Sequence, residues 1–112
     1  MLTDRNLASL GDAYVNFAYS LALSNLKGQP SGVKVKGSAL ALALREAGLR
    51  QHMPSRITSH TLADAAEALI VYAWLHNYTT LEESVAILQE QNDLTEGLTR
   101  LIKTIMNRIK LS

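Results

Sequence analysis

Three carboxylates stand in stretches of the sequence that are otherwise mostly apolar. Asp12 lies within residues 7–15, and Asp64 and Glu67 lie within residues 62–71. A spacing of three places Asp64 and Glu67 on one face of a helix, about one turn apart. No Lys or Arg lies one helical turn from any of the three acids. Because like charges one turn apart destabilise a helix, and burial raises that cost, we expect a cation from elsewhere to meet them.

Two kinds of cation satisfy this expectation. A hard divalent ion, Mg²⁺ or Mn²⁺, prefers oxygen ligands and would be held by the carboxylates directly. A buried salt bridge to a distant arginine, such as Arg45 or Arg56, would neutralise them without any metal. The Asp-x-x-Glu spacing is common in helices, and charge networks of purely structural value also perturb carboxylates. Taken alone, the three acids therefore leave both interpretations open.

Composition narrows the class of protein. The chain has 112 residues, which predicts one domain over residues 1–112. It contains no cysteine, which excludes disulfide scaffolds, thiolate metal sites and cysteine nucleophiles, and three histidines do not suggest a histidine-rich zinc centre. The longest apolar run, residues 68–75, is too short to span a bilayer, and charged residues interrupt the first 25 residues, unlike a signal peptide. We expect a soluble, cytoplasmic protein.

Helical periodicity dominates the chain, and no segment alternates as a strand would. These patterns predict an all-α fold, a single compact domain of about five helices. The helix over residues 59–76 is apolar on nearly every side, so it is expected at the centre. The first helix is predicted to be capped by Thr3 and to end near Asn25, and the second to have Ser38 as its N-cap and Gly48 as its C′ residue. A third is predicted from Ser59 to His76. Two more are opened by the capping boxes Thr80 with Glu83 and Asp93 with Glu96.

The charges are unevenly distributed along the chain. Between residues 27 and 60 the only acid is Glu46, whereas the last helix region is again basic and residues 78–96 are acidic. Such blocks indicate a dipolar surface that could meet an anionic partner, although solvated helix faces of different sign would give the same pattern. The candidates for contact with such an anionic partner are the basic residues Lys34, Lys36, Arg45, Arg50 and Arg56.

The sequence motifs around the three acids resemble those of a known family. Leu10-Gly11-Asp12-Ala13, preceded by Leu-Ala-Ser, resembles the signature helix of the ribonuclease III family, whose Leu-Gly-Asp-Ala/Ser step carries a metal-ligating Asp. Residues 62–70 resemble the family's second motif, Ala-Asp-x-x-Glu-Ala-Leu, in a long central helix. Residues 40–49 are similar to the intervening helix, which typically ends in Gly-Leu. The motifs occur in the family's order across most of the chain.

This resemblance implies a function and a site. Asp12, Asp64 and Glu67 fall on metal-ligand positions, so the protein would be an endoribonuclease that cleaves double-stranded or structured RNA with Mg²⁺ or Mn²⁺. By the same analogy it would act as a homodimer, with one active site per subunit and short 3′ overhangs on the product. Gly11 would allow the first helix to approach the central helix closely and bring Asp12 beside the other two acids.

The sequence resembles the compact, mini-ribonuclease III-like branch, because no double-stranded-RNA-binding domain follows the helices. We therefore expect the nuclease domain itself to hold RNA through the basic segment. Lys34 and Lys36, two residues apart in a loop, are predicted to contact phosphates without touching the metal. His60, one turn before Asp64, is a candidate accessory residue, although local hydrogen bonding at a helix start is the commoner role.

Two positions depart from the family pattern. Most members place a further ligand, Glu, four residues before the signature Asp, where this chain has Ala8, a small residue as in the compact branch. Asn16, one turn after Asp12, could supply a neutral oxygen instead or be an exposed helix residue. At Ser9 the family often carries an aromatic residue that packs across the dimer. Two alternatives stay open: a catalytically reduced member that binds RNA or a protein, and a plain helical interaction module.

Overall fold

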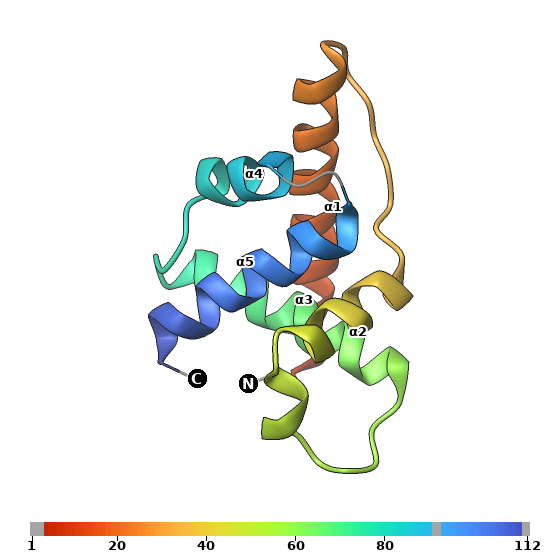
Figure 1. The fold of residues 1–112 in the computed structure, drawn as a ribbon, viewed down its shortest axis with the longest axis vertical. Helices are drawn as coiled ribbons and strands as arrows, with labels where there is room; N and C mark the ends of the chain where they lie inside the picture. Colours follow the sequence, from red (N-terminus) through yellow and green to blue (C-terminus); the bar gives the residue numbers. More distant parts are fainter. Residues whose placement is uncertain (1–3, 91–92, 111–112) are drawn as a thin grey trace.

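The computed structural model describes residues 4–90 and 93–110. Within these ranges the chain forms five α-helices and one short 3₁₀ helix, with no strand, which confirms the all-α prediction (Figure 1). The elements are α1 (Arg5–Lys27), α2 (Gly37–Glu46), the 3₁₀ helix η1 (Leu49–His52), α3 (Ser59–Leu75), α4 (Leu81–Glu90) and α5 (Leu94–Ile109).

The ends of the first helix follow from its flanking residues. Asp4 caps α1, because its Oδ1 accepts hydrogen bonds from the backbone N–H groups of Asn6 (2.9 Å) and Leu7 (3.1 Å). The predicted cap, Thr3, lies outside the described residues, and Asp4 fills that role. At the other end Gly28 adopts a left-handed conformation, with φ of 74°, and its N–H bonds the carbonyl of Ser24.

The second helix begins two residues earlier than predicted. Lys36 occupies the N-cap position without a side-chain hydrogen bond, so the expectation of Ser38 as N-cap was wrong. Gly48 has φ of 89° and directly precedes η1, an element that the sequence did not predict. The predicted caps of the last two helices are confirmed, since Glu83 N–H donates to Thr80 Oγ1 (3.1 Å) and Glu96 N–H donates to Asp93 Oδ2 (3.3 Å).

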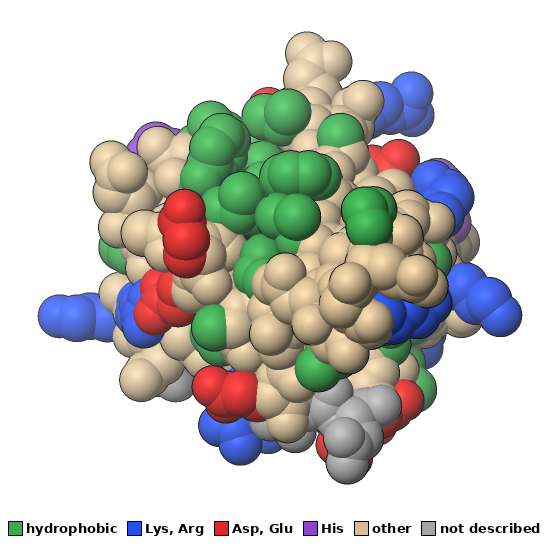
Figure 2. Space-filling model, turned by 90° about the horizontal axis from the view of Figure 1, so that it is seen from above, with side chains coloured by type: hydrophobic (Ala, Val, Ile, Leu, Met, Phe, Trp, Pro, Cys, Tyr) green, Lys and Arg blue, Asp and Glu red, His purple; other side chains and the backbone are tan. Residues whose placement is uncertain are grey.

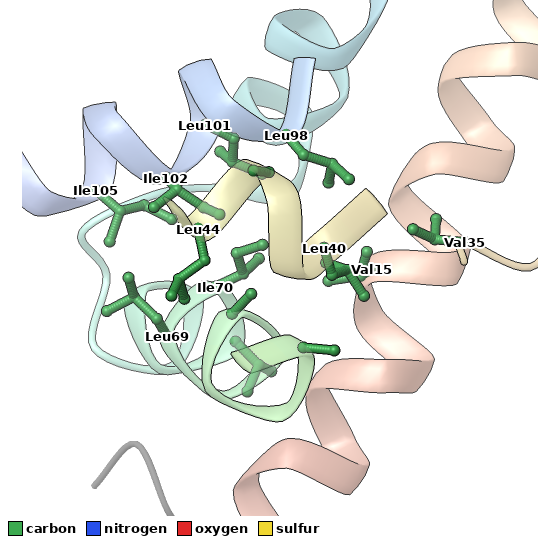
Figure 3. Close-up of a cluster of buried hydrophobic side chains, with 14 of the residues drawn as sticks. Val15, Val35, Leu40, Leu44, Leu69, Ile70, Leu98, Leu101, Ile102 and Ile105 are labelled. Atoms are coloured by element: carbon green, nitrogen blue, oxygen red, sulfur yellow. The ribbon is translucent and has the colours of Figure 1, made fainter. Parts of the chain in front are cut away.

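The predicted central helix is confirmed. α3 packs against α1, α2 and α5, and buried residues occur around most of its circumference. The core that surrounds it is built mainly from aliphatic side chains (Figure 3). Its largest fully buried members include Leu40 and Leu44 of α2, Leu69 and Ile70 of α3, and Leu98, Leu101, Ile102 and Ile105 of α5. This core fixes α3 rigidly, and α3 carries two of the three acids.

Several large hydrophobic side chains reach the surface, and the space-filling view shows hydrophobic groups gathered in one area of the face seen from above (Figure 2). The exposed large hydrophobic residues are Leu10, Phe17, Leu26, Leu42, Trp74, Leu75 and Tyr78. Among the described residues, no helix combines the length and the hydropathy that a membrane crossing requires.

Candidate active-site cleft

The helices α1 and α3 meet most closely at Gly11. A Cβ atom added at Gly11 would lie 2.1 Å from the backbone oxygen of Glu67, 2.5 Å from its carbonyl carbon and 3.0 Å from its Cβ. No side chain larger than hydrogen can occupy this position without moving the backbone. The close approach that Gly11 was predicted to allow is therefore confirmed, and it places Asp12, the next residue of α1, beside Glu67.

The three acids face one cleft between α1, α3 and the start of α2. The cleft has a volume of about 800 Å³, and its wall includes Asp12, Asp64 and Glu67. Three basic side chains, Arg5, Lys34 and His60, line the same cleft. The sequence motifs, which are 52 residues apart from Asp12 to Asp64, thus meet in a single hollow that is large enough for a phosphate group and its water.

Glu67 is the buried member of the group, with 7% of the residue exposed. Burial raises the pKa of its carboxyl to about 8, and a hydrogen bond to Asp12 and the negative charges of Asp12 and Asp64 contribute to the increase. The pKa of Asp12 moves in the opposite direction, lowered first by the hydrogen bond from Glu67 and then by Lys34. Near neutral pH, Glu67 therefore keeps its proton, and its O–H group donates a hydrogen bond to the Asp12 carboxylate.

The two more exposed acids have basic neighbours. Lys34 Nζ lies 3.4 Å from Asp12 Oδ2, and His60 Nε2 lies 3.6 Å from Asp64 Oδ2. The remaining ion pair in the described part of the chain joins Arg108 to Glu83, away from the cleft. The alternative of a buried salt bridge from the acids to Arg45 or Arg56 is therefore contradicted for residues 4–90 and 93–110, and no Lys or Arg is paired with Glu67 there.

Asn16 holds Asp12 in place. Its Nδ2 donates to Asp12 Oδ1 (3.2 Å), and its Oδ1 accepts the backbone N–H of Val35 (2.7 Å). Because a backbone N–H can only donate, this second bond fixes which end of the amide points at Asp12. The carbonyl oxygen of Asn16 is thus already engaged. Asn16 orients the acid and does not offer the spare ligand oxygen considered above, nor is it simply an exposed helix residue.

A comparison with known protein families covers the same residues. The family model described as Ribonuclease III matches residues 5–110, nearly the whole chain, including both acidic motifs. The chain belongs to the ribonuclease III family. No curated protein matches it in sequence. The family places the acids of α1 and α3 in the context of a nuclease domain, and ribonuclease III domains generally use divalent metals.

The donor set of this ribonuclease III cleft fits a hard divalent ion in chemistry. Carboxylate oxygens are the preferred ligands, and a buried acid that holds a proton next to two further acids is a site deficient in positive charge. In residues 4–90 and 93–110, no three His, Cys, Asp or Glu side chains lie close enough together to hold a metal ion between them. A metal would therefore be held by few protein ligands, as Mg²⁺ commonly is.

Ala8 stands at the position where the family resemblance predicts a further glutamate. It lies one turn before Asp12, is 8% exposed and lines the cleft. Its methyl group leaves space in the cleft wall and contributes no oxygen. The departure that the sequence indicated therefore falls on the cleft itself and not on a remote part of the helix.

The basic residues proposed to hold RNA lie in different environments. Lys34 points at Asp12, whereas the sequence had placed both loop lysines away from the metal ligands. Arg50 donates to the carbonyls of Pro54 (2.8 Å) and Ser55 (2.6 Å) and so closes its own loop. Lys36, Arg45 and Arg56 are exposed and do not line the cleft of the described residues. Of the five, Lys34 is the one that the fold brings to the acids.

Proposed function

We propose that this ribonuclease III domain is a divalent-metal-dependent endoribonuclease that hydrolyses phosphodiester bonds in double-stranded or structured RNA. The observation that supports it most strongly is Glu67: a buried acid, hydrogen-bonded to Asp12, one turn from Asp64, and without a paired Lys or Arg among the described residues. A protein of purely structural purpose gains little from a buried carboxyl that lies near two further acids, because burying such a group weakens the fold.

In this proposal Asp12, Asp64 and Glu67 would hold Mg²⁺ or Mn²⁺. When bound, such an ion polarises a backbone phosphate, lowers the pKa of water and stabilises the leaving oxygen. The chain's own residues suit this role: Asn16 orients the Asp12 carboxylate, and the Glu67 carboxyl would lose its proton to solvent if a cation bound there. His60, 3.6 Å from Asp64, is placed to orient that acid or an RNA phosphate at the rim.

The direct test is incubation of the purified chain with end-labelled duplex RNA, with Mg²⁺, with Mn²⁺ and with excess chelator. We expect cleavage only with metal, and loss of cleavage in Asp64→Asn, whose side chain is 40% exposed and can change without disturbing the fold. Specific binding of duplex RNA without cleavage under every metal condition would instead support the catalytically reduced alternative. Neither binding nor cleavage would support the helical interaction module.

The absence of a carboxylate at Ala8 favours the catalytically reduced alternative, and a substitution at this position tests it. Ala8→Glu places a carboxylate in the cleft one turn before Asp12. We expect Mn²⁺ affinity to rise by roughly tenfold, because each added carboxylate strengthens a site for hard cations. Isothermal titration with Mn²⁺ measures the effect, and Ala13→Glu, on an exposed position of α1 away from the cleft, is the control. Equal affinity in Ala8→Glu and the unaltered protein would contradict the role of position 8.

A homodimer is the assembly that the family analogy implies, and α1 carries a surface that suits it. Leu10 and Phe17 are seven residues apart on one face of α1 and are 45% and 54% exposed. Tyr14 lies between them and is itself buried, and the exposed Trp74 packs against it with ring centroids 5.2 Å apart. These four residues form what we call the α1 apolar face. An exposed apolar stripe with aromatic members is typical of a subunit interface.

Phe17→Asp should therefore separate the dimer into monomers, since it places a charge on the α1 apolar face. Light scattering after size exclusion measures the mass directly. Trp74 is the only tryptophan of the chain, so dissociation should also shift its fluorescence to longer wavelength. Leu42→Asp, on an exposed leucine of α2, serves as the control and should leave the mass unchanged. A monomeric unaltered protein at micromolar concentration would rule out this assembly.

A further inference from the structure

The ammonium group of Lys34 places a positive charge directly before Asp12 in the cleft. Its Nζ is 3.4 Å from both Asp12 Oδ1 and Asp12 Oδ2, so it sits symmetrically before the carboxylate. The side chain is 75% exposed, which leaves the flexible four-carbon stem free to turn elsewhere. Its charge also acts on the buried acid, since it favours the ionised form of Glu67.

The backbone on either side of Lys34 is attached to α1 by a regular set of hydrogen bonds. Asn16 Oδ1 accepts Val35 N–H (2.7 Å), Ser20 Oγ accepts Val33 N–H (2.9 Å), and Ser24 Oγ accepts Ser31 N–H (2.8 Å). Ser20 Oγ is also 3.1 Å from the carbonyl of Val33 and can donate to it. Figure 1 shows this connector running beside α1 on its way to α2. We call these bonds the α1 ladder.

The α1 ladder fixes the position of Lys34 along α1, because the rise of one helical turn matches the span of two residues in the extended connector. Four residues of a helix rise about 6 Å, and two residues of an extended chain span about 6.6 Å. Side chains at positions 16, 20 and 24 of α1 can therefore bond residues 35, 33 and 31 in turn. A slip of the connector by one residue would break all three bonds. Lys34, between the two anchored valines, is held over Asp12 while its ammonium stays mobile.

We propose that Lys34 is a tethered cation of the cleft: it neutralises Asp12 while the acids hold no metal, and it turns to an RNA phosphate when a divalent ion binds them. This proposal rests on the proposed function. Metal and ammonium repel each other at Asp12, so the ion displaces Lys34. The anion that then lies within reach of a tethered ammonium is the backbone of the bound RNA. Asn16 and Ser20 act as positioning residues for Lys34.

The test begins with metal alone. Titration with Mn²⁺ in the absence of RNA should show about tenfold tighter binding to Lys34→Ala than to the unaltered protein, because a competing cation has been removed. Lys36→Ala is the matched control: it removes the same charge two residues away, from an exposed side chain that makes no capping hydrogen bond and does not line the cleft of the described residues. Its Mn²⁺ affinity should change by less than about twofold.

The second measurement is RNA affinity with the acids saturated by Ca²⁺, which occupies oxygen sites. Lys34→Ala should bind duplex RNA more weakly and reduce the slope of log affinity against log salt by about one. Ser20→Ala, which releases Val33, should shift both Mn²⁺ and RNA affinity in the same directions as Lys34→Ala but less. A merely structural role for Ser20 would lower stability without tightening Mn²⁺ binding.

The outcomes separate this inference from the proposed function. If the unaltered protein binds Mn²⁺ and cleaves RNA, but Lys34→Ala has the same Mn²⁺ affinity, the tethered cation is wrong and the nuclease assignment stands. If the slope of log RNA affinity against log salt were the same in Lys34→Ala as in the unaltered protein, the proposed phosphate contact would likewise be wrong. If the unaltered protein takes up neither Mn²⁺ nor Mg²⁺, the proposed function fails, and the role of Lys34 fails with it.

Discussion

Glu67→Gln should abolish RNA cleavage and, at the same time, stabilise the metal-free fold at alkaline pH. The amide keeps the shape of the side chain and can still donate a hydrogen bond to Asp12. It has no charge to bury, and it holds Mg²⁺ poorly. We expect cleavage to fall by roughly a thousandfold, the scale on which a ligand to a catalytic metal acts. Metal-free stability should move in the opposite direction from activity.

The pH dependence of stability has a definite sign. The pKa of Glu67 is raised from its ordinary 4.5 to about 8 in the folded chain, so unfolding releases a proton between these two values. Stability of the metal-free protein should therefore fall as pH rises from 4.5 to 8, and the loss should be complete above 8. At a pH of about 9, Glu67→Gln should be more stable than the unaltered protein by up to about 5 kcal/mol, since the pKa of Glu67 rises from 4.5 to about 8 on folding and a pKa difference of one corresponds to about 1.4 kcal/mol.

Urea denaturation followed by Trp74 fluorescence, in chelator and at pH values of about 5, 7 and 9 that bracket the titration, measures this dependence. Glu46→Gln, which replaces an exposed glutamate of α2 with the corresponding amide, should leave the pH profile of the unaltered protein unchanged. A large loss of stability in Glu67→Gln at every pH would point the other way. It would mean that the charge of Glu67 is balanced by a cation of the fold, as in the salt-bridge interpretation.

Local sequence signals were sufficient to predict most of the fold. Thr80 with Glu83 and Asp93 with Glu96 mark the true starts of α4 and α5, because a capping box involves only four consecutive residues. The start of α2 was misplaced for the opposite reason. Lys36 follows Val35, whose backbone is bonded to Asn16 of α1, so a contact across 19 residues determines where the extended segment ends.

In the candidate site, too, the features set by local sequence could be predicted, and those set by contacts between distant segments could not. The spacing of Asp64 and Glu67 predicted a shared helix face but not their different depths, because Glu67 is covered by α1 at Gly11 whereas Asp64 lies at the rim. The position of Lys34 could not be predicted at all. It depends on the α1 ladder, whose members at positions 16, 20 and 24 look in sequence like an ordinary polar helix face. That four-residue period opposite an extended segment is the signal that sequence reasoning missed.

Gly11→Ala should be among the most destabilising substitutions that add a single methyl group to this chain. In an open helix the change from glycine to alanine favours the fold by about 1 kcal/mol. Here the new Cβ would lie 2.1 Å from the backbone oxygen of Glu67, and both atoms belong to rigid helices that cannot turn aside as a flexible side chain could. Overpacking of this kind costs about 3 kcal/mol or more, a large part of the stability of a small domain.

The same strain should also weaken metal binding, because α1 can relieve it only by moving away from α3 and carrying Asp12 away from Glu67. We expect Gly11→Ala to lower the melting temperature by at least about 10 °C and to weaken Mn²⁺ binding in the fraction that stays folded. Ala13→Gly, at an exposed position two residues along α1, changes helix propensity in the reverse direction and should cost about 1 kcal/mol with Mn²⁺ affinity intact. If Gly11→Ala were as stable as the unaltered protein, α1 and α3 would not touch at this point. The contact that brings Asp12 to Glu67, and with it the assignment of these two acids to one metal, would then have to be abandoned.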